Sequence, residues 1–287
     1  MRLNALSNVR LWAAALALLP GLLAAQLTTR HVKGHIYMLE GPGGNIAVSA
    51  GPDGILIVDD KYRRTAEQIK AALADLDKGD LQFILNTHYH GDHTGSNAFF
   101  GGETPILAHE NVRRRLMDEG KPAKAWPVIT FPQQLSVHFN GERVRAMHYP
   151  SSHTDGDIAV AFTGADVLAL GDLFFSGMFP YVDVPGGGRV SGLIESLDDI
   201  LEHFTAEVLI IPGHGPLSDL DDLRSYRDMI VQTSGLIRAE MARGRSMAQT
   251  QRKGLPRKWA SWSRNFITEA RWIEIVYESY GLEGAGP

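Results

Sequence analysis

The segment from His88 to His93 constrains this chain more than any other, because it places three imidazoles and one carboxylate in six residues. It reads His-Tyr-His-Gly-Asp-His and follows Leu81–Asn86, an apolar run typical of a buried β-strand. Packing does not account for so many polar rings in one glycine-containing loop. Imidazole and carboxylate are ligands that Zn²⁺ and similar ions accept. We therefore expect a strand to deliver this loop to a metal site.

The spacing inside the segment indicates two ions. Side chains at i and i+2 of an extended chain share a face, so His88 and His90 can point toward one ion. Gly91 lets the chain turn, so that Asp92 and His93 face a second ion. The helical His-Glu-x-x-His spacing of another class of zinc enzymes is absent.

Three further ligand candidates lie near the ends of expected strands. His153 lies in a polar turn, Asp172 follows the apolar run Val167–Leu170, and His214 follows Ile210–Gly213. Each alone is a weak signal. Strand-end loops can gather at one edge of a sheet, so the set is much stronger than its members.

Together these motifs resemble the five-motif signature of the metallo-β-lactamase superfamily, over roughly residues 35–216. The resemblance implies an α/β fold, a four-layer αββα sandwich with the site at one edge of its two sheets. It also implies a first metal held by His88, His90 and His153, and a second held by Asp92, His93 and His214. Asp172 would bridge both metals. Asp59, which ends the expected strand Ile55–Asp59, would orient a histidine ligand.

The chemistry implied is hydrolysis with two Zn²⁺ ions, or Fe or Mn in their place. Two ions ~3.5–4 Å apart lower the pKa of a shared water, and the resulting hydroxide attacks a carbonyl carbon. Asp92 would also orient that nucleophile as a catalytic residue. Two alternatives stay open: an iron-dependent redox enzyme of the same fold, and a periplasmic metal-binding module without catalysis.

The substrate class is narrowed by departures from the family. Class B β-lactamases carry Cys or Ser where this chain has Asp172, whereas the glyoxalase II and lactonase side of the family has Asp. The glyoxalase II context after the last histidine is missing. Acyl-homoserine lactonases have a tyrosine where Phe175 stands, which leaves Tyr181 as the alternative phenol. A β-lactam, lactone or thioester therefore stays open as substrate.

Candidate pocket residues follow Asp172 in sequence: Phe174, Phe175, Phe179 and Tyr181. Gly186–Gly188 is interpreted either as a mobile flap or as a turn.

The first 25 residues have the pattern of a secretory signal peptide. Arg2 and Arg10 precede an apolar run, Leu11–Ala25, which ends in small residues. This run is shorter than the ~20 residues a membrane-spanning helix needs. We therefore expect a periplasmic or secreted protein without stable membrane association after cleavage.

Composition limits the ligands and partners. The chain has no cysteine, so any metal must be held by His, Asp or Glu. The net charge of −5 and the lack of a basic run argue against a nucleic-acid partner. We expect a small-molecule substrate. Oligomeric state is left open by the sequence.

Hydrophobic periodicity outlines one domain over residues 26–287, with a helical C-terminal extension from about residue 218. Thr65 is expected to open a helix with a capping box. Trp259, Trp262, Phe266 and Trp272 in the extension could stack on a ligand, although packing of the extension is the favoured interpretation. The expected elements are strands at 35–39, 45–50, 55–59, 81–86, 105–109 and 207–211, hairpins at 134–148 and 157–170, and helices at 111–119 and 193–204.

Overall fold

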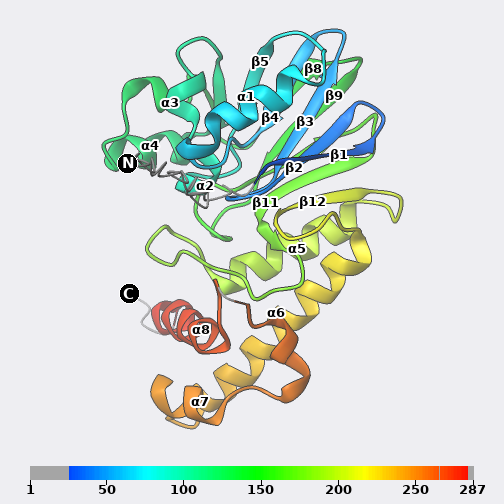
Figure 1. The fold of residues 1–287 in the computed structure, drawn as a ribbon. Helices are drawn as coiled ribbons and strands as arrows, with labels where there is room; N and C mark the ends of the chain where they lie inside the picture. The colour runs from blue at the N-terminus through cyan, green and yellow to red at the C-terminus, as the bar shows by residue number, and fades with distance from the viewer. Residues whose placement is uncertain (1–25, 265, 284–287) are drawn as a thin grey trace, which may run out of the picture.

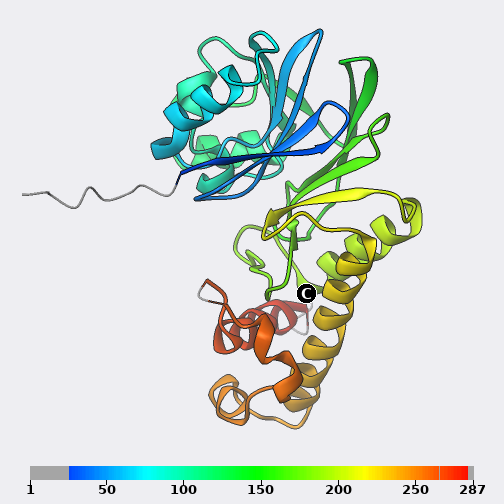
Figure 2. The ribbon, with the colours of Figure 1, turned by 45° about the vertical axis from the view of Figure 1, so that its right-hand side comes forward.

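The computed structural model of the chain describes residues 26–264 and 266–283. The predicted signal peptide at residues 1–25 lies outside this part and stays a prediction. Two β-sheets pack face to face, and helices cover the outer face of each (Figure 1). Figure 2 shows the same layers turned, with the long helix α6 (Leu220–Ala242) along one side of the helical part. The expected αββα sandwich is confirmed.

The first sheet of the described residues contains, in spatial order, β1 (Thr28–Lys33), β2 (Ile36–Glu40), β3 (Ile46–Gly51), β4 (Gly54–Val58), β5 (Leu81–Leu85), β6 (Ile106–His109) and β7 (Ile129–Phe131). Strands β1 to β4 are antiparallel, whereas β4 to β7 run parallel. Parallel neighbours share the edge at which their carboxyl ends lie. Asp59 follows β4 and His88 follows the end of β5, so both reach that edge.

The second sheet contains, in spatial order, β12 (Leu209–His214), β11 (Val167–Phe175), β10 (Ile158–Phe162), β9 (Glu142–His148) and β8 (Gln134–Phe139). Only β11 and β12 are parallel neighbours here; the other pairs are antiparallel. The expected hairpins at 134–148 and 157–170 are therefore confirmed.

Helices connect and cover the sheets. Those on the side of the first sheet are α1 (Ala66–Ala74), α2 (Gly91–Thr94), α3 (Asn97–Phe100) and α4 (Glu110–Asp118). Those on the side of the second sheet are α5 (Val190–His203), α6, α7 (Met247–Lys253) and α8 (Glu269–Glu283). Short 3₁₀ turns span Arg63–Thr65, Ala123–Ala125 and Arg257–Trp262. Among the described residues, no helix is long and apolar enough to cross a membrane.

Alternation along the strands builds the layers. Leu56 and Val58 of β4 face the second sheet, whereas Ile57 between them faces α1 on the outside. In β11, Ala169 faces the first sheet and Leu170 faces the helical side. A strand with both faces buried needs apolar residues at successive positions, which explains its continuous apolar run.

Two local predictions were wrong. Thr65 forms no capping box, because its own backbone is helical (φ −99°, ψ −3°) after the preceding 3₁₀ turn and its hydroxyl donates to the carbonyl of Tyr62. The strand expected to end at Leu170 continues to Phe175, which places Asp172 inside β11.

Candidate metal centre

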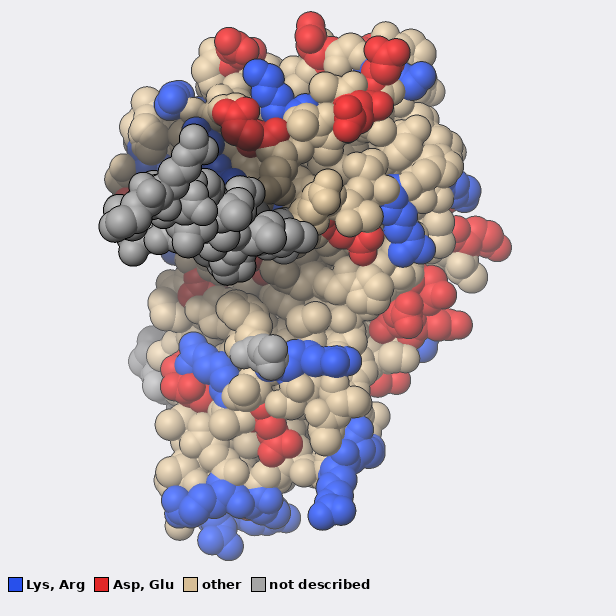
Figure 3. Space-filling view, in the orientation of Figure 1, with Lys and Arg blue, Asp and Glu red and all other residues tan. Residues whose placement is uncertain are grey.

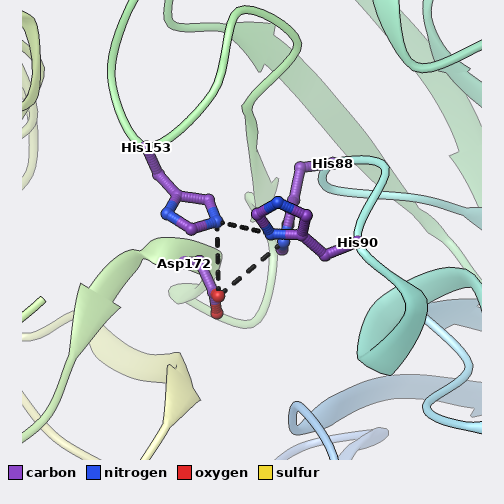
Figure 4. A group of neighbouring side chains, drawn as sticks. All are labelled: His88, His90, His153 and Asp172. Carbon is purple, nitrogen blue, oxygen red and sulfur yellow. Dashed lines mark hydrogen bonds and ion pairs between the residues drawn. The ribbon is translucent and has the colours of Figure 1, made fainter. Parts of the chain in front are cut away.

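The structure brings all seven predicted ligand residues together at the edge where the carboxyl ends of β5, β11 and β12 meet. They form two groups that could each hold a metal ion: His88, His90, His153 and Asp172, and beside them Asp92, His93 and His214. Figure 4 shows the first group, whose side chains converge from three separate segments of the chain. The ligand atoms within each group lie within 4.8 Å of one another.

Asp172 lies between the two groups and turns one carboxylate oxygen toward each. Its Oδ2 is 3.7 Å from Nε2 of His88 and 3.5 Å from Nε2 of His153. Its Oδ1 is 3.1 Å from Nε2 of His93 and 3.3 Å from Nε2 of His214. This arrangement suits a carboxylate that bridges two cations.

A glycine gives Asp172 this position. Gly171 has a φ of +49°, in the left-handed region, and the pairing of β11 with β12 shifts register around it. A β-carbon at Gly171 would lie 2.4 Å from the hydroxyl oxygen of Thr87. The bulge therefore requires glycine, and it directs the Asp172 side chain to the sheet edge.

Asp59 connects the ligand loop to the first sheet. Its Oδ2 lies 2.7 Å from Nδ1 of His93, and its Oδ1 accepts from the backbone N–H of Thr87 at 2.7 Å. The Thr87 hydroxyl also donates to Asp59 and lies 3.0 Å from Nδ1 of His88. Asp59 thus holds two rings through their Nδ1 atoms, one directly and one through Thr87.

Asp183 holds a third ring, and no sequence motif points to it. Its Oδ2 is 3.0 Å from Nε2 of His90 and also accepts from the hydroxyl of Tyr89. The segment 183–188 folds into a turn, because the backbone N–H of Gly188 donates to the carbonyl of Asp183 at 2.9 Å and the backbone N–H of Gly186 donates to Oδ1 of Asp183 at 3.0 Å. The turn interpretation of Gly186–Gly188 therefore agrees with the structure.

His153 is fixed through backbone and loop contacts. Its Nδ1 lies 2.8 Å from the carbonyl oxygen of Tyr181. Asp157 accepts from both the backbone N–H and the hydroxyl of Thr154, at 2.7 and 2.6 Å, which fixes the loop that carries His153.

These partners determine which ring nitrogens face the interior of the site. His90 donates its Nε2 hydrogen to Asp183, and His153 donates its Nδ1 hydrogen to Tyr181. Their other nitrogens lie 2.9 Å apart and carry lone pairs in the neutral rings. Two facing lone pairs repel unless a cation lies beside them. The same logic leaves Nε2 of His88 bare, and that atom is buried without a hydrogen-bond partner among the described residues. The site therefore fits a metal.

Burial and neighbouring charges shift the pKa values of the ligand side chains. Burial by itself would raise the pKa of Asp172, but the nearby His93 and His214 outweigh it and hold that pKa well below its usual range. Burial lowers the pKa of His153 to about 4 and also lowers that of His88 well below its usual range. Both rings are therefore neutral at neutral pH, as a metal ligand must be.

The rings of the second group, His93 and His214, have more carboxylates near them than the rings of the first group. Burial would lower the pKa of His93, but Asp172, Asp59 and Asp92 outweigh burial and raise it. For His214, burial is likewise outweighed, chiefly by Asp172, and the pKa rises to about 9. The carboxylates that stabilise a proton on these rings stabilise a divalent cation in its place.

The predicted pocket residues separate into two sets. Phe174 packs against Tyr226, and Phe179 stacks on Trp272, so the structure assigns both to the helical core instead of a pocket wall. Phe174 faces the helices because β11 alternates its faces, whereas Phe179 follows β11 and its backbone N–H donates to the carbonyl of Trp262 at 2.9 Å. Phe175 stacks on the ring of His214, with centroids 5.2 Å apart. Tyr181 lies 5.9 Å from His90 and 5.8 Å from His153, between ring centroids.

The sequence pattern of the metallo-beta-lactamase superfamily matches residues 30–214. This match covers more than half of the chain and all seven site residues, so the chain belongs to the metallo-β-lactamase superfamily.

Solved structures share the fold. DIM-1 metallo-beta-lactamase superimposes with a TM-score of 0.64 at 18% identity, over 72% of this chain and 98% of that one. The metallo-beta-lactamase from Pontibacter korlensis gives 0.65 at 14% identity, over 71% and 99%. At these identities the likeness concerns the fold alone.

Sequence relatives are matched over part of their length. The 2,4-dinitroanisole O-demethylase subunit alpha of Nocardioides sp. is 29% identical over 160 residues, 53% of this chain and 47% of that protein. Hydroxyacylglutathione hydrolase of Synechocystis sp. is 30% identical over 127 residues, 42% and 47% respectively. The probable metallo-hydrolase YqgX of Bacillus subtilis is 26% identical over 148 residues, 48% and 70% respectively. The chain thus spans less than half the length of the first two.

Proposed function

We propose that this chain is a metal-dependent hydrolase that holds two zinc ions and cleaves a small carbonyl substrate of the lactone, thioester or β-lactam type. The observation that carries the proposal is Asp172, whose two oxygens face separate groups of imidazoles. Two divalent ions supply a hydroxide nucleophile at neutral pH and a Lewis acid for the carbonyl oxygen.

The protein's own residues have distinct roles in this proposal. His88, His90 and His153 would hold one ion, Asp92, His93 and His214 would hold the other, and Asp172 would contact both. Asp92 is 20% exposed, whereas Asp172 is nearly buried. Asp92 therefore faces the side from which water and substrate would arrive, and its carboxylate would accept a hydrogen bond from the attacking water and orient it.

Support for an acyl substrate comes from Asp172 and from the relatives. An aspartate at the bridging position resembles the thioesterase and lactonase side of the family. Two of the relatives are named hydroxyacylglutathione hydrolase and probable metallo-hydrolase. The signal-peptide pattern at residues 1–25 supports an exported enzyme, and we propose a periplasmic or secreted location.

The test is a hydrolysis panel with the purified, zinc-loaded protein: a lactone, S-lactoylglutathione, a β-lactam and a phosphodiester. We expect turnover of at least one carbonyl substrate. Asp92→Ala should reduce kcat/KM by about 100-fold or more, because loss of a metal ligand has a larger effect than loss of a residue that only hydrogen-bonds to a ligand. Asp75→Ala is the control and should behave as wild type, because Asp75 is an exposed residue at the C-terminal end of α1.

Two outcomes contradict the proposal. The first is no turnover of any carbonyl substrate by protein that contains zinc. The second is protein from its native host that contains iron and consumes oxygen, which supports the redox alternative.

A further inference from the structure

The C-terminal helical part places an exposed aromatic ring beside the metal centre. Phe266 is 65% exposed, yet its ring centroid lies 6.4 Å from that of His214 in the second ligand group. The backbone beside it is anchored, because Ile267 is buried and accepts from the backbone N–H of Arg264 at 3.1 Å. A large apolar side chain exposed beside polar ligands costs hydrophobic free energy that packing does not offset.

A second ring completes the feature. Tyr181 lies 6.2 Å from Phe266, edge to face, and also lies against His90 and His153 of the first group. The two rings therefore span the site, Tyr181 beside one ligand group and Phe266 beside the other. Figure 3 shows a recess in the surface between the part of the molecule that holds the sheets and the helical part.

Arg271 of α8 fixes Tyr181. Its guanidinium carbon lies 5.9 Å from the Tyr181 ring centroid, within the range of a cation–π contact. Its charge is already engaged by Glu274 at 2.7 Å and by Glu278 at 3.8 Å. Arg271 is therefore a positioning residue for the Tyr181 ring and not a free anion site.

We propose that Phe266 and Tyr181 form a specificity wall that selects substrates with an aromatic or large apolar group next to the scissile carbonyl. This inference rests on the proposed hydrolase function. Its key residue lies outside the segment that matches the family, residues 30–214, so the wall is a feature of this chain's C-terminal part. An aromatic group that packs against the surface formed by these two rings gains both apolar burial and ring contacts.

The wall contacts a part of the substrate that does not react. Its interaction is present equally in the bound substrate and in the transition state, so it acts on KM more than on kcat. We expect a phenylacetyl substrate to exceed the matched acetyl substrate in kcat/KM by at least about 10-fold. Phe266→Ala should remove most of that preference by raising KM, and should leave the acetyl substrate unchanged.

The experiment compares phenylacetyl and acetyl members of whichever carbonyl class the zinc-loaded enzyme hydrolyses. Wild type, Phe266→Ala, Phe266→Leu and the control Leu236→Ala are measured together. Leu236 is an exposed apolar residue on α6. Phe266→Leu should retain part of the preference, because it keeps an apolar surface. Binding of phenylacetate against acetate to the zinc-loaded proteins, followed by saturation-transfer NMR, gives a readout without turnover.

The outcomes separate this inference from the proposed function. Loss of the preference in Phe266→Ala, with the acetyl substrate and the Leu236→Ala control unchanged, supports the wall. An equal preference in wild type and Phe266→Ala overturns the wall and leaves the hydrolase standing. If no substrate is hydrolysed, the proposed function fails. In that case the binding readout still tests the wall. If wild type and Phe266→Ala bind phenylacetate equally, the wall is overturned as well. If only the variant loses phenylacetate binding, the wall is supported.

Discussion

Replacement of Asp183 by Asn tests whether the hydrogen bonds behind the ligands determine metal affinity. Asp183 accepts from Nε2 of His90 at 3.0 Å and from the hydroxyl of Tyr89. These donors keep the carboxylate ionised, since together they outweigh burial and lower its pKa. Asn has the same shape but no charge, and its NH₂ group can donate to Nε2 of His90. That would move the ring hydrogen to Nδ1, the nitrogen that faces His153.

The magnitude follows from the hydrogen bond that is lost. A bond to a charged group contributes about 1 kcal/mol more than a neutral one, and loss of imidazole basicity adds to this. We expect affinity for the zinc ion of the group that contains His90 to fall about 10–100-fold, which corresponds to about 1.4–2.7 kcal/mol of binding free energy. The other ion, held by Asp92, His93 and His214, should bind with little change.

The assay is competition for zinc with a chromophoric chelator. Asp199→Asn is a matched control, because Asp199 accepts a similar hydrogen bond from the Tyr149 hydroxyl at 2.9 Å without contacting a ligand histidine. Thermal unfolding of the metal-free proteins separates metal affinity from folding. Wild-type affinity for both ions in Asp183→Asn would refute the reasoning.

Two further predictions concern packing and pH. Gly44→Ala should reduce bound zinc from two ions to one, because its β-carbon would lie 2.1 Å from Cε1 of His93, a buried ring that Asp59 holds in place; metal analysis checks this, and two retained ions would contradict it. His109 stacks on His148 with centroids 3.6 Å apart, and burial together with His148 lowers the pKa of His109 from 6.5 to about 4. The unfolded chain therefore binds more protons than the folded one between about pH 4 and 6.5, so this group destabilises the protein as pH falls through that range. His109→Asn keeps a side chain that can cap α4. In urea unfolding, the free energy of unfolding should fall less from pH 7 to pH 5 in this variant than in the wild type. Equal losses would count against this account.

Much of the site could be predicted from the sequence because its ligands lie in compact motifs. His88, His90, Asp92 and His93 lie in one loop whose residue types and spacing suit metal binding far better than core packing. The apolar runs before them predicted the strands, since buried parallel strands require continuous apolar residues.

The missed features depend on contacts that no local pattern encodes. Asp183 is an isolated acid in the sequence, and it reaches His90 only because the turn at 183–188 folds back over the ligand loop. For Phe266, Trp259 and Trp272 the sequence favours packing over stacking on a ligand, and the structure buries only the two tryptophans of these three residues. An aromatic residue in a helical segment gives no sign of whether its ring faces the core or a site more than fifty positions away in the sequence, at His214.

The same limit applies to the candidate pocket residues Phe174 and Phe175. Phe174 and Phe175 are neighbours and both are fully buried, but strand alternation places Phe174 against Tyr226 and Phe175 against His214. Which of them faces the site depends on the register of β11, and Gly171 shifts that register.

Zinc stoichiometry is the most direct test of the central claim, that two adjacent ligand groups share Asp172. Metal-free protein is dialysed to equilibrium against buffered zinc, and bound metal is counted by mass spectrometry. The account predicts two ions per chain for the wild type. One ion or none bound by the folded wild-type protein at saturating zinc would contradict it.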